Sequence, residues 1–389
     1  MYAILKRGLM AVFATMALAA CQVIPDGGPV QTPGPVVTQP DMPSDTALPT
    51  DTERHRVALL VPLSGSNAAV GQSIANATTM ALLDTSADNL RITTYDTASG
   101  AGTAASRAIA DGNKLILGPL LREDVGAVLA QARPVDVPLI TFSNDAGIAR
   151  PDVFVMGLVP EQAISRTVNF AIGQGARRFA ALVPEGEYGD RALAALQRAA
   201  DARGGSVVLS ERYSRSNRSI ISAAGRLEAA GGFDTVLIAD GARLAAMAAG
   251  ELKDAGEDLP SIIGTELWSG EPSLINEPAL RGAWFASVSE NRVGQFVQSY
   301  EARFGDTPNR LATLGYDAVL LTLRIARDWQ PGRDFPVGRL IDDGGFLGVD
   351  GPFRFRSDGL GERALEVRQL GNGTIEVVDP APTSFASGG

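Results

Sequence analysis

The side chains that most often perform catalysis or bind metals are scarce in this chain of 389 residues. It has one cysteine, Cys21, and one histidine, His55. Catalytic and metal-binding histidines need partners on a rigid scaffold, and His55 stands at the edge of a proline-rich segment. We therefore expect His55 to be exposed and inert. With His55 interpreted as inert, a Ser–His–Asp triad is excluded. A zinc site of the His-Glu-x-x-His type is excluded as well, because it needs two histidines.

Other sequence patterns for catalysis or cofactor binding are also missing or weak. The chain has no Gly-x-Ser-x-Gly, no Ser-x-x-Lys and no Gly-Lys pair for a phosphate-binding loop. The segment 100–105, GAGTAA, fits Gly-x-Gly-x-x-Ala, but it follows the second predicted strand, whereas a dinucleotide fingerprint follows the first. We interpret it as a turn with Thr103 near a helix start. We predict no enzymatic activity, no metal and no cofactor.

Carboxylates are numerous, and the net charge is −10. That charge disfavours binding to nucleic acid, whose phosphates need a basic surface. Charged residues on loops after strands are usually solvated, and we expect this of the following carboxylates: Glu185, Glu187, Asp190, Asp240 and Glu266. No pair among them is marked out for general acid–base catalysis.

Cys21 follows a short positive segment, Lys6-Arg7, and an apolar run from Gly8 to Ala20. The ending Leu18-Ala19-Ala20-Cys21 resembles the lipobox of bacterial lipoproteins. We expect residues 1–20 to be a signal peptide and Cys21 to be lipidated, leaving no thiol for a disulfide. A plain secretory signal with a chance cysteine is the alternative. No second apolar stretch of spanning length follows, so we expect the chain to be anchored to a membrane, not threaded through it.

Residues 21–54 contain seven prolines among Gly, Thr, Gln and Asp. Large apolar residues are too sparse there to form a core, so we expect a disordered linker. At about 3.1 Å per residue when fully extended, it would reach on the order of 90 Å from the membrane.

From residue 55 onward, apolar runs alternate with segments of helical spacing, which predicts right-handed βαβ units and parallel sheets. Two such series follow each other, and both begin similarly, with ALLVP at 58–62 and AALVP at 180–184. The expected α/β fold has two lobes, each a parallel sheet flanked by helices, joined by crossover segments. We assign 55–159 and 287–361 to lobe 1, 160–286 and 362–378 to lobe 2, and 379–389 to a disordered tail. A late β-hairpin is predicted over 351–378, turned at Gly371-Asn372-Gly373.

Several stretches together resemble the type I periplasmic binding proteins, in their leucine/isoleucine/valine-binding branch. They are VALLVPLSGSNAAVGQ, LILGPL, VPLITFSND, EYGD, DTVLIADGARLAAM, IIGTE, LGYDAVLLTL and GPFRFRSDG. The resemblance covers Val57 to Val378 and implies a ligand cleft between the lobes, at the carboxyl ends of the strands. By position it implies these cleft residues: Ser64, Arg122, Ser143, Asn144, Tyr188, Asp240 and Glu266.

Tyr188 and Glu266 match the aromatic and acidic positions with which this family holds an amino acid. Three other positions depart from that pattern. Arg122 replaces a small hydroxyl residue, Ala242 stands where an aromatic residue is common, and VFVMGL at 153–158 lacks the usual arginine. These departures leave the implied amino-acid clamp incomplete.

The lipobox, VALLVPLSGSNAAVGQSI and ILGPLLREDVGAVLA are similar to one sub-branch, the LppC-like penicillin-binding-protein activator lipoproteins. That resemblance implies an envelope lipoprotein on the periplasmic side of the outer membrane of a Gram-negative bacterium, partnered by a bifunctional penicillin-binding protein. The alternative is the substrate-binding protein of an ABC transporter for branched-chain amino acids or a similar small ligand. Where the enterobacterial member has a large helical N-terminal domain, we expect the disordered linker in its place.

Overall fold

The computed structural model describes residues 53–253, 260–290, 292–383 and 385. The chain divides into two units, Met1–Pro49 and Thr50–Gly389, and the described residues belong to the second. The expected signal peptide, the lipidation site Cys21 and the linker up to residue 52 lie outside the described residues. Residues 384 and 386–389 of the predicted tail do too, whereas Asp379, which was assigned to the tail, is the last residue of a strand.

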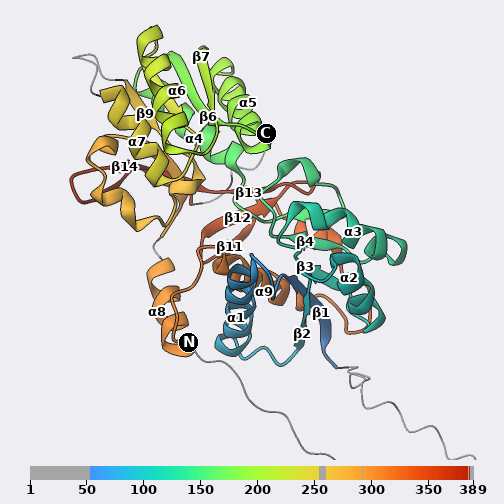
Figure 1. Cartoon of the computed structure of the whole chain (residues 1–389). Coiled ribbons are helices and arrows are strands. Elements are labelled where there is room, and N and C mark those ends of the chain that lie inside the picture. Colours follow the sequence, from blue (N-terminus) through green and yellow to red (C-terminus); the bar gives the residue numbers. More distant parts are fainter. Residues whose placement is uncertain (1–52, 254–259, 291, 384, 386–389) are drawn as a thin grey trace, which may run out of the picture. The chain divides into compact units, whose positions relative to one another are not determined.

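Five parallel strands form the sheet of the first lobe, in the order β2-β1-β3-β4-β5 (Figure 1). Helices cover both faces, so the central strands are almost wholly apolar, as parallel sheets require. The strands are β1 (His55–Val61), β2 (Leu90–Asp96), β3 (Leu115–Leu117), β4 (Leu139–Thr141) and β5 (Val153–Val155). The helices between them are α1 (Ala68–Asp84), α2 (Ala101–Ala110) and α3 (Arg122–Ala132).

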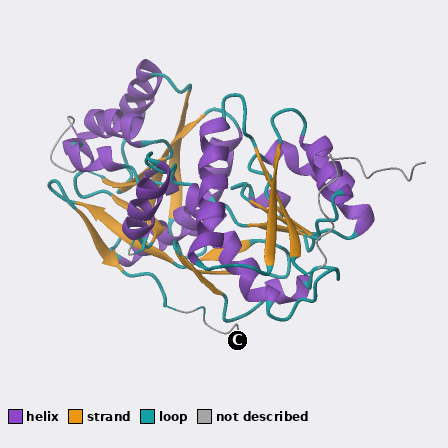
Figure 2. Ribbon diagram, turned by 90° about the horizontal axis from the view of Figure 1, so that it is seen from below, coloured by secondary structure: helices purple, strands orange, loops and turns teal. Residues whose placement is uncertain are grey.

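Seven strands form the sheet of the second lobe, in the order β15-β14-β10-β9-β8-β6-β7, with helices packed against it (Figure 2). The strands are β6 (Arg178–Pro184), β7 (Ser206–Tyr213), β8 (Thr235–Ile238), β9 (Ser261–Ile263), β10 (Trp284–Val288), β14 (Leu365–Leu370) and β15 (Ile375–Asp379). The helices are α4 (Pro160–Gly173), α5 (Glu187–Asp201), α6 (Asn217–Ala230) and α7 (Ala242–Lys253). The β14 strand is antiparallel to both of its neighbours.

The chain passes between the lobes after β5, after β10 and after β13. After β10 it forms α8 (Val293–Phe304) and α9 (Ala312–Ala326), and α9 packs along α1 of the first lobe. A three-stranded antiparallel sheet follows, made of β11 (Phe346–Gly348), β12 (Gly351–Phe355) and β13 (Gly361–Arg363).

Two sequence-based expectations differ from this arrangement. The assigned boundaries at 286/287 and 361/362 fall inside β10 and β13, so each strand extends two residues beyond the expected switch. The single late hairpin is instead divided. Its first half belongs to the three-stranded sheet, and only β14 and β15 form a hairpin in the large sheet, because β14 pairs with β10 on its other side.

A buried cluster of charges joins the crossover segments. Arg310 lies 3.0 Å from Asp350, and Asp317 of α9 accepts the backbone N–H of Val349 at 2.6 Å. Burial, and next the neighbouring Asp350 carboxylate, raise the pKa of Asp317 to about 7. The side chain of Arg363 on β13 is also buried and donates to the carbonyl oxygen of Met156 at 2.8 Å. This hydrogen bond connects the last passage between the lobes, which begins after β13, with the first, which begins after β5.

The expectation that His55 is solvent-exposed is wrong. His55 is the first residue of β1, is 3% exposed, and stacks on Trp329 with ring centroids 4.2 Å apart. Burial lowers the pKa of His55, which keeps the imidazole neutral. Its role is packing at the end of the first strand, with an aromatic partner that lies far away in the sequence.

The shared pattern ALLVP and AALVP has a structural counterpart at the first helix of each series. Gly71 of α1 and Gly189 of α5 both lie against the proline that ends the preceding strand. A Cβ atom on Gly71 would lie 1.8 Å from the carbonyl oxygen of Pro62, and one on Gly189 would lie 1.8 Å from that of Pro184. Only glycine allows helix and strand to approach this closely.

We expect Gly189→Ala to lower the free energy of unfolding by about 1–3 kcal/mol, because the added methyl group must push backbone apart. Gly126→Ala is the matched control, since Gly126 lies in α3 with nothing near its Cβ position. There, alanine should leave stability unchanged or raise it by up to about 1 kcal/mol. Urea unfolding of both variants measures this, and equal effects would contradict the close approach.

Candidate functional site

The seven predicted cleft residues all lie just beyond the carboxyl ends of parallel strands, where ligands bind in open α/β sheets. In the first lobe they follow β1, β3 and β4: Ser64, Arg122, Ser143 and Asn144. In the second lobe they follow β6, β8 and β9: Tyr188, Asp240 and Glu266.

Glu266 is buried, contrary to the expectation that it is solvated. Its side-chain Oε1 lies 3.0 Å from the hydroxyl of Tyr188, which donates to it, and Tyr188 also lies 3.0 Å from Thr265 Oγ1. Burial raises the pKa of Glu266 to about 7, against the smaller opposing effects of its own backbone N–H and of Tyr188. Among the described residues Oε2 has no hydrogen-bond partner, and Glu266 and Ser269 both line a small cavity of about 10 Å³. The carboxyl group is therefore enclosed beneath Tyr188.

Asp240 is also buried, contrary to expectation, because it is surrounded by donors. Its Oδ2 accepts the hydroxyl of Tyr213 at 2.9 Å and Nε of Arg215 at 3.2 Å, while Oδ1 accepts the N–H of Gly241 at 2.8 Å. The Arg215 guanidinium also lies 5.6 Å from the ring centroid of Tyr188. Both carboxylate oxygens of Asp240 are thus engaged within the lobe.

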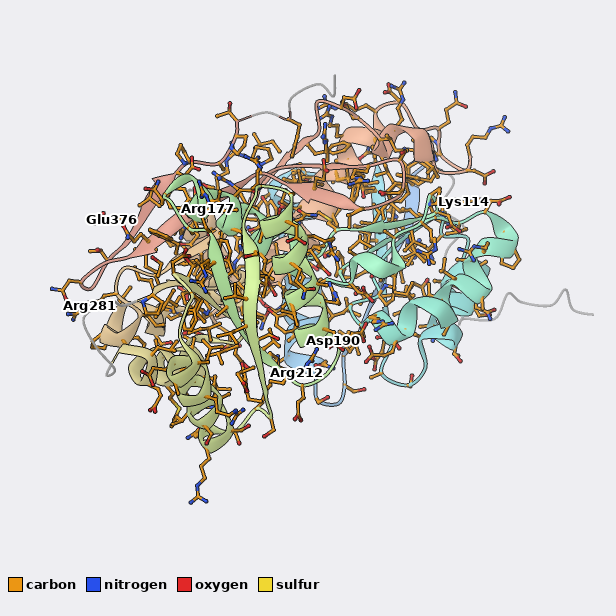
Figure 3. All side chains as sticks on the ribbon, turned by 90° about the horizontal axis from the view of Figure 1, so that it is seen from above. Lys114, Arg177, Asp190, Arg212, Arg281 and Glu376 are labelled. Carbon is orange, nitrogen blue, oxygen red and sulfur yellow. The ribbon has the colours of Figure 1, made fainter. Side chains whose placement is uncertain are left out.

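A second ion pair lies on the same lobe. Arg212 on β7 contacts Asp190 on α5 at 2.6 Å, and Figure 3 shows the two side chains beside each other. Because both side chains are exposed, this pair contributes little to stability.

The hydroxyl residues of the first lobe are used in local turns. Ser64 donates to Asp96 Oδ2 at 3.1 Å, and Ser143 Oγ accepts the N–H of Asp145 at 3.2 Å. The backbone N–H of Leu63, then that of Ala98, lower the pKa of Asp96. The O–H of Ser64 is therefore used by Asp96, whereas Ser143 accepts a hydrogen bond without using its own O–H.

Arg122 connects the two lobes. Its Nε lies 2.9 Å from Asp145 Oδ2 in its own lobe, and its Nη1 pairs with Glu187 at the first position of α5 in the other lobe. The sequence reasoning placed Arg122 near the cleft but did not find Asp145, and it expected Glu187 to be merely solvated.

Arg191 makes a second connection, which the sequence reasoning missed. From α5 it contacts Glu161 of α4 through Nε at 2.8 Å and donates Nη2 to the carbonyl oxygen of Asn144 at 2.7 Å. A further contact, from Nη1 to Asp145 Oδ1, spans 3.9 Å. We call these five side chains the interlobe bridge. Arg122 and Asp145 come from the first lobe, Glu187 and Arg191 come from the second, and Glu161 pairs with Arg191 within the second lobe.

The arrangement leaves few free groups for an amino-acid ligand. Such a ligand needs donors for its carboxylate and an accessible acid for its ammonium group. Of the seven predicted cleft side chains, only that of Asn144 lacks a polar partner among the described residues. The guanidinium that stands in place of a small hydroxyl residue is paired with carboxylates of both lobes.

In the described part of the chain, no group of three or more His, Cys, Asp or Glu side chains could hold a metal ion. No helix there has both the length and the apolar character needed to cross a membrane.

Residues 55–374 match the family described as "Periplasmic binding protein". The chain belongs to this family. A putative branched-chain amino acid ABC transporter from Rhodospirillum rubrum has a similar structure, with a TM-score of 0.74, 23% identity, and coverage of 84% of this chain and 100% of that one. The leucine binding protein LivK from Thermotoga maritima gives a TM-score of 0.63 at 20% identity, with 84% and 98% coverage. These likenesses confirm the two-lobed type I fold.

Sequence relatives match over shorter stretches. The penicillin-binding protein activator LpoA of Pantoea ananatis is 30% identical over 129 residues, which is 33% of this chain and 19% of that protein. Uncharacterized protein RP748 of Rickettsia prowazekii is 31% identical over 134 residues, 34% of this chain and 36% of that protein. The matched stretches thus cover between about a fifth and about a third of these relatives' lengths.

The enclosed Glu266 predicts a pH-dependent stability. Its pKa is about 7 when folded and ordinarily 4.5, so its contribution is fully present below pH 4.5 and is lost as pH rises through 7. Over that pH range, we expect the free energy of unfolding to fall by about 3 kcal/mol more in wild-type protein than in Glu266→Gln. The measurement is urea unfolding at a series of pH values.

The control is Glu185→Gln, which alters an exposed glutamate on the loop after β6. It should keep the wild-type pH dependence. Identical pH profiles for wild type and Glu266→Gln would show that Glu266 is not enclosed.

Proposed function

We propose that this protein is a lipid-anchored envelope protein that activates a bifunctional penicillin-binding protein by contact, without being an enzyme. One observation carries the proposal. Polar side chains at the predicted ligand site bind one another: Arg122 pairs with Asp145 in its own lobe and with Glu187 across the lobes. A binding protein for amino acids instead keeps such groups free for its ligand.

The sequence relatives support the same function. Penicillin-binding protein activators from Pantoea ananatis and Pectobacterium parmentieri share 30% and 29% identity with about a third of this chain. Their activity as whole proteins is transferred here as a proposal, since the match covers 19% of each.

The proposed anchor fits the proposed role. With Cys21 lipidated at the periplasmic side of the outer membrane, the proline-rich residues 21–54 would serve as a spacer toward the cell wall. A Gln, not an Asp, follows the cysteine, which fits sorting to the outer membrane.

A second candidate is the substrate-binding component of an ABC transporter. Tyr188 and Glu266 support it, because an aromatic ring and an acid stand where the family holds the amino group of its ligand. The solved neighbours from Rhodospirillum rubrum and Thermotoga maritima share the fold with this chain. On this alternative the interlobe bridge would have to open to admit leucine or a similar ligand.

The experiment compares the two candidates on one preparation. Purified protein is mixed with the bifunctional synthase of the same organism, and glycan polymerisation is followed; we expect a faster rate. In parallel, leucine, isoleucine and valine are tested for a shift of the thermal midpoint. A ligand present at 100 times its Kd would stabilise the protein by about 2.7 kcal/mol, and we expect no such shift.

Cys21→Ser is the control for the anchor. In solution this variant should still stimulate the synthase, while in cells it should fail to support cell-wall synthesis. A clear shift with leucine together with an unchanged polymerisation rate would refute the proposed function and favour the transporter.

A further inference from the structure

A cavity of about 610 Å³ lies along α4 and α5 of the second lobe, and none of the seven predicted cleft residues lines it. We call it the arginine groove, after the side chains used below: Ser165, Asn169, Ala195, Arg198, Ala199 and Arg203. Its volume falls within the range of about 300–1,000 Å³ that is typical of ligand sites.

The groove has an excess of uncompensated positive charge. Its two lining glutamates are already neutralised by arginines, Glu161 by Arg191 at 2.8 Å and Glu362 by Arg354 at 2.8 Å. Within the described residues, neither Arg198 nor Arg203 has an acidic or hydrogen-bonding partner for its side chain. The net charge of the protein is −10, but two free guanidinium groups give this groove a local positive potential that attracts anions.

The rest of the lining suits a peptide better than a small inorganic anion. The side chains of Ser165 and Asn169 are half-buried and have no polar partner within the described part of the chain. Ala195 and Ala199 of α5 are buried and add apolar surface. Hydroxyl and amide groups beside apolar surface match the alternating polar and apolar character of a peptide.

The chain itself shows how an arginine of this groove holds an acidic segment. Arg166 of α4, which also lines the groove, contacts the Asp379 carboxylate at 2.7 Å. The same guanidinium donates through Nε to the carbonyl oxygen of Leu365 at 3.0 Å and through Nη2 to that of Pro380 at 3.5 Å. One guanidinium thus binds both a carboxylate and backbone carbonyls of extended segments, which is how arginine clusters recognise acidic motifs.

We propose that the arginine groove binds a short acidic peptide segment of a partner protein. Arg198 and Arg203 pair with two of its carboxylates, and Ser165 and Asn169 hydrogen-bond to its backbone. The two arginines stand five positions apart along the chain, so they match carboxylates on two different residues of an extended peptide. The inference rests on the groove alone and does not depend on the proposed function.

The test measures fluorescence anisotropy of a labelled hexapeptide of alternating alanine and glutamate, with the alanine–glutamine peptide as the uncharged comparison. We expect the glutamate peptide to bind wild-type protein, to bind the double variant Arg198→Ala/Arg203→Ala at least tenfold more weakly, and to lose affinity as salt rises. The glutamine peptide should not bind.

The matched control is Arg218→Ala/Arg327→Ala, which removes the same charge at exposed arginines that do not line the groove. It should bind the glutamate peptide like wild type. The proposal is overturned if wild type does not bind that peptide, if both double variants bind it equally, or if inorganic phosphate binds the groove in its place.

Discussion

A charge removed from water must be paired. The buried carboxylate of Asp145 meets this requirement with arginines from both lobes, and so links the two lobes. Its side chain is 6% exposed and receives the backbone N–H of Gly147 at 2.8 Å and the guanidinium of Arg122 at 2.9 Å. Arg191 of the second lobe approaches its other oxygen. Loss of one partner of a buried ion pair costs about 3–5 kcal/mol, because the remaining charge stays buried.

The parts of the interlobe bridge differ in strength. The pair between Arg122 and Glu187 is about half exposed, and such pairs contribute about 0–1 kcal/mol. Arg191 and Glu161 have side chains exposed by only 18% and 20%, and Arg191 also donates to a carbonyl oxygen of the first lobe. The pair with Glu161 lies within the second lobe and holds Arg191 in place, and the hydrogen bond from Arg191 to Asn144 then joins the lobes. The pair between Arg122 and Glu187 adds a more exposed contact between them.

This pairing explains how a family fold can keep its architecture while its predicted ligand site changes character. The sheets, the crossovers and the strand-end positions match those of binding proteins. In this chain, however, Asp240 is saturated by Tyr213 and Arg215, and Glu266 is enclosed beneath Tyr188. Two of the predicted cleft side chains, Asp240 and Glu266, are thus buried and bonded within the second lobe.

Local sequence patterns were sufficient to predict most strands and helices, because burial on both faces of a parallel sheet leaves continuous apolar runs such as ALLV in β1. The repeated ALLVP and AALVP also have a structural counterpart, although the close approaches of Gly71 and Gly189 to the preceding segments became visible only in the structure. Side-chain environments were harder to predict. His55 depends on Trp329, and the enclosure of Glu266 depends on Tyr188, partners that no local pattern identifies.

The interlobe bridge escaped prediction for the same reason. Arg122 and Glu187 stand 65 positions apart, and Arg191 and Asn144 stand 47 apart. Their proximity follows from the placement of α3 and α5 in the fold and from the chain's passage between lobes, not from spacing in the sequence. Arg122 was found only because it occupies one of the family's cleft positions, where it replaces a small hydroxyl residue.

The central claim is that the lobes are bridged without a ligand, and the distance between them tests it most directly. Spin labels at Ser66→Cys in the first lobe and Ser222→Cys in the second, both exposed positions, are introduced with Cys21→Ser so that no other thiol reacts. Pulsed electron paramagnetic resonance should give one narrow distribution of distances between the two labels in the absence of ligand. Leucine should leave this distribution unchanged, and Arg191→Ala should broaden it. A broad distribution that narrows when leucine is added would contradict the account.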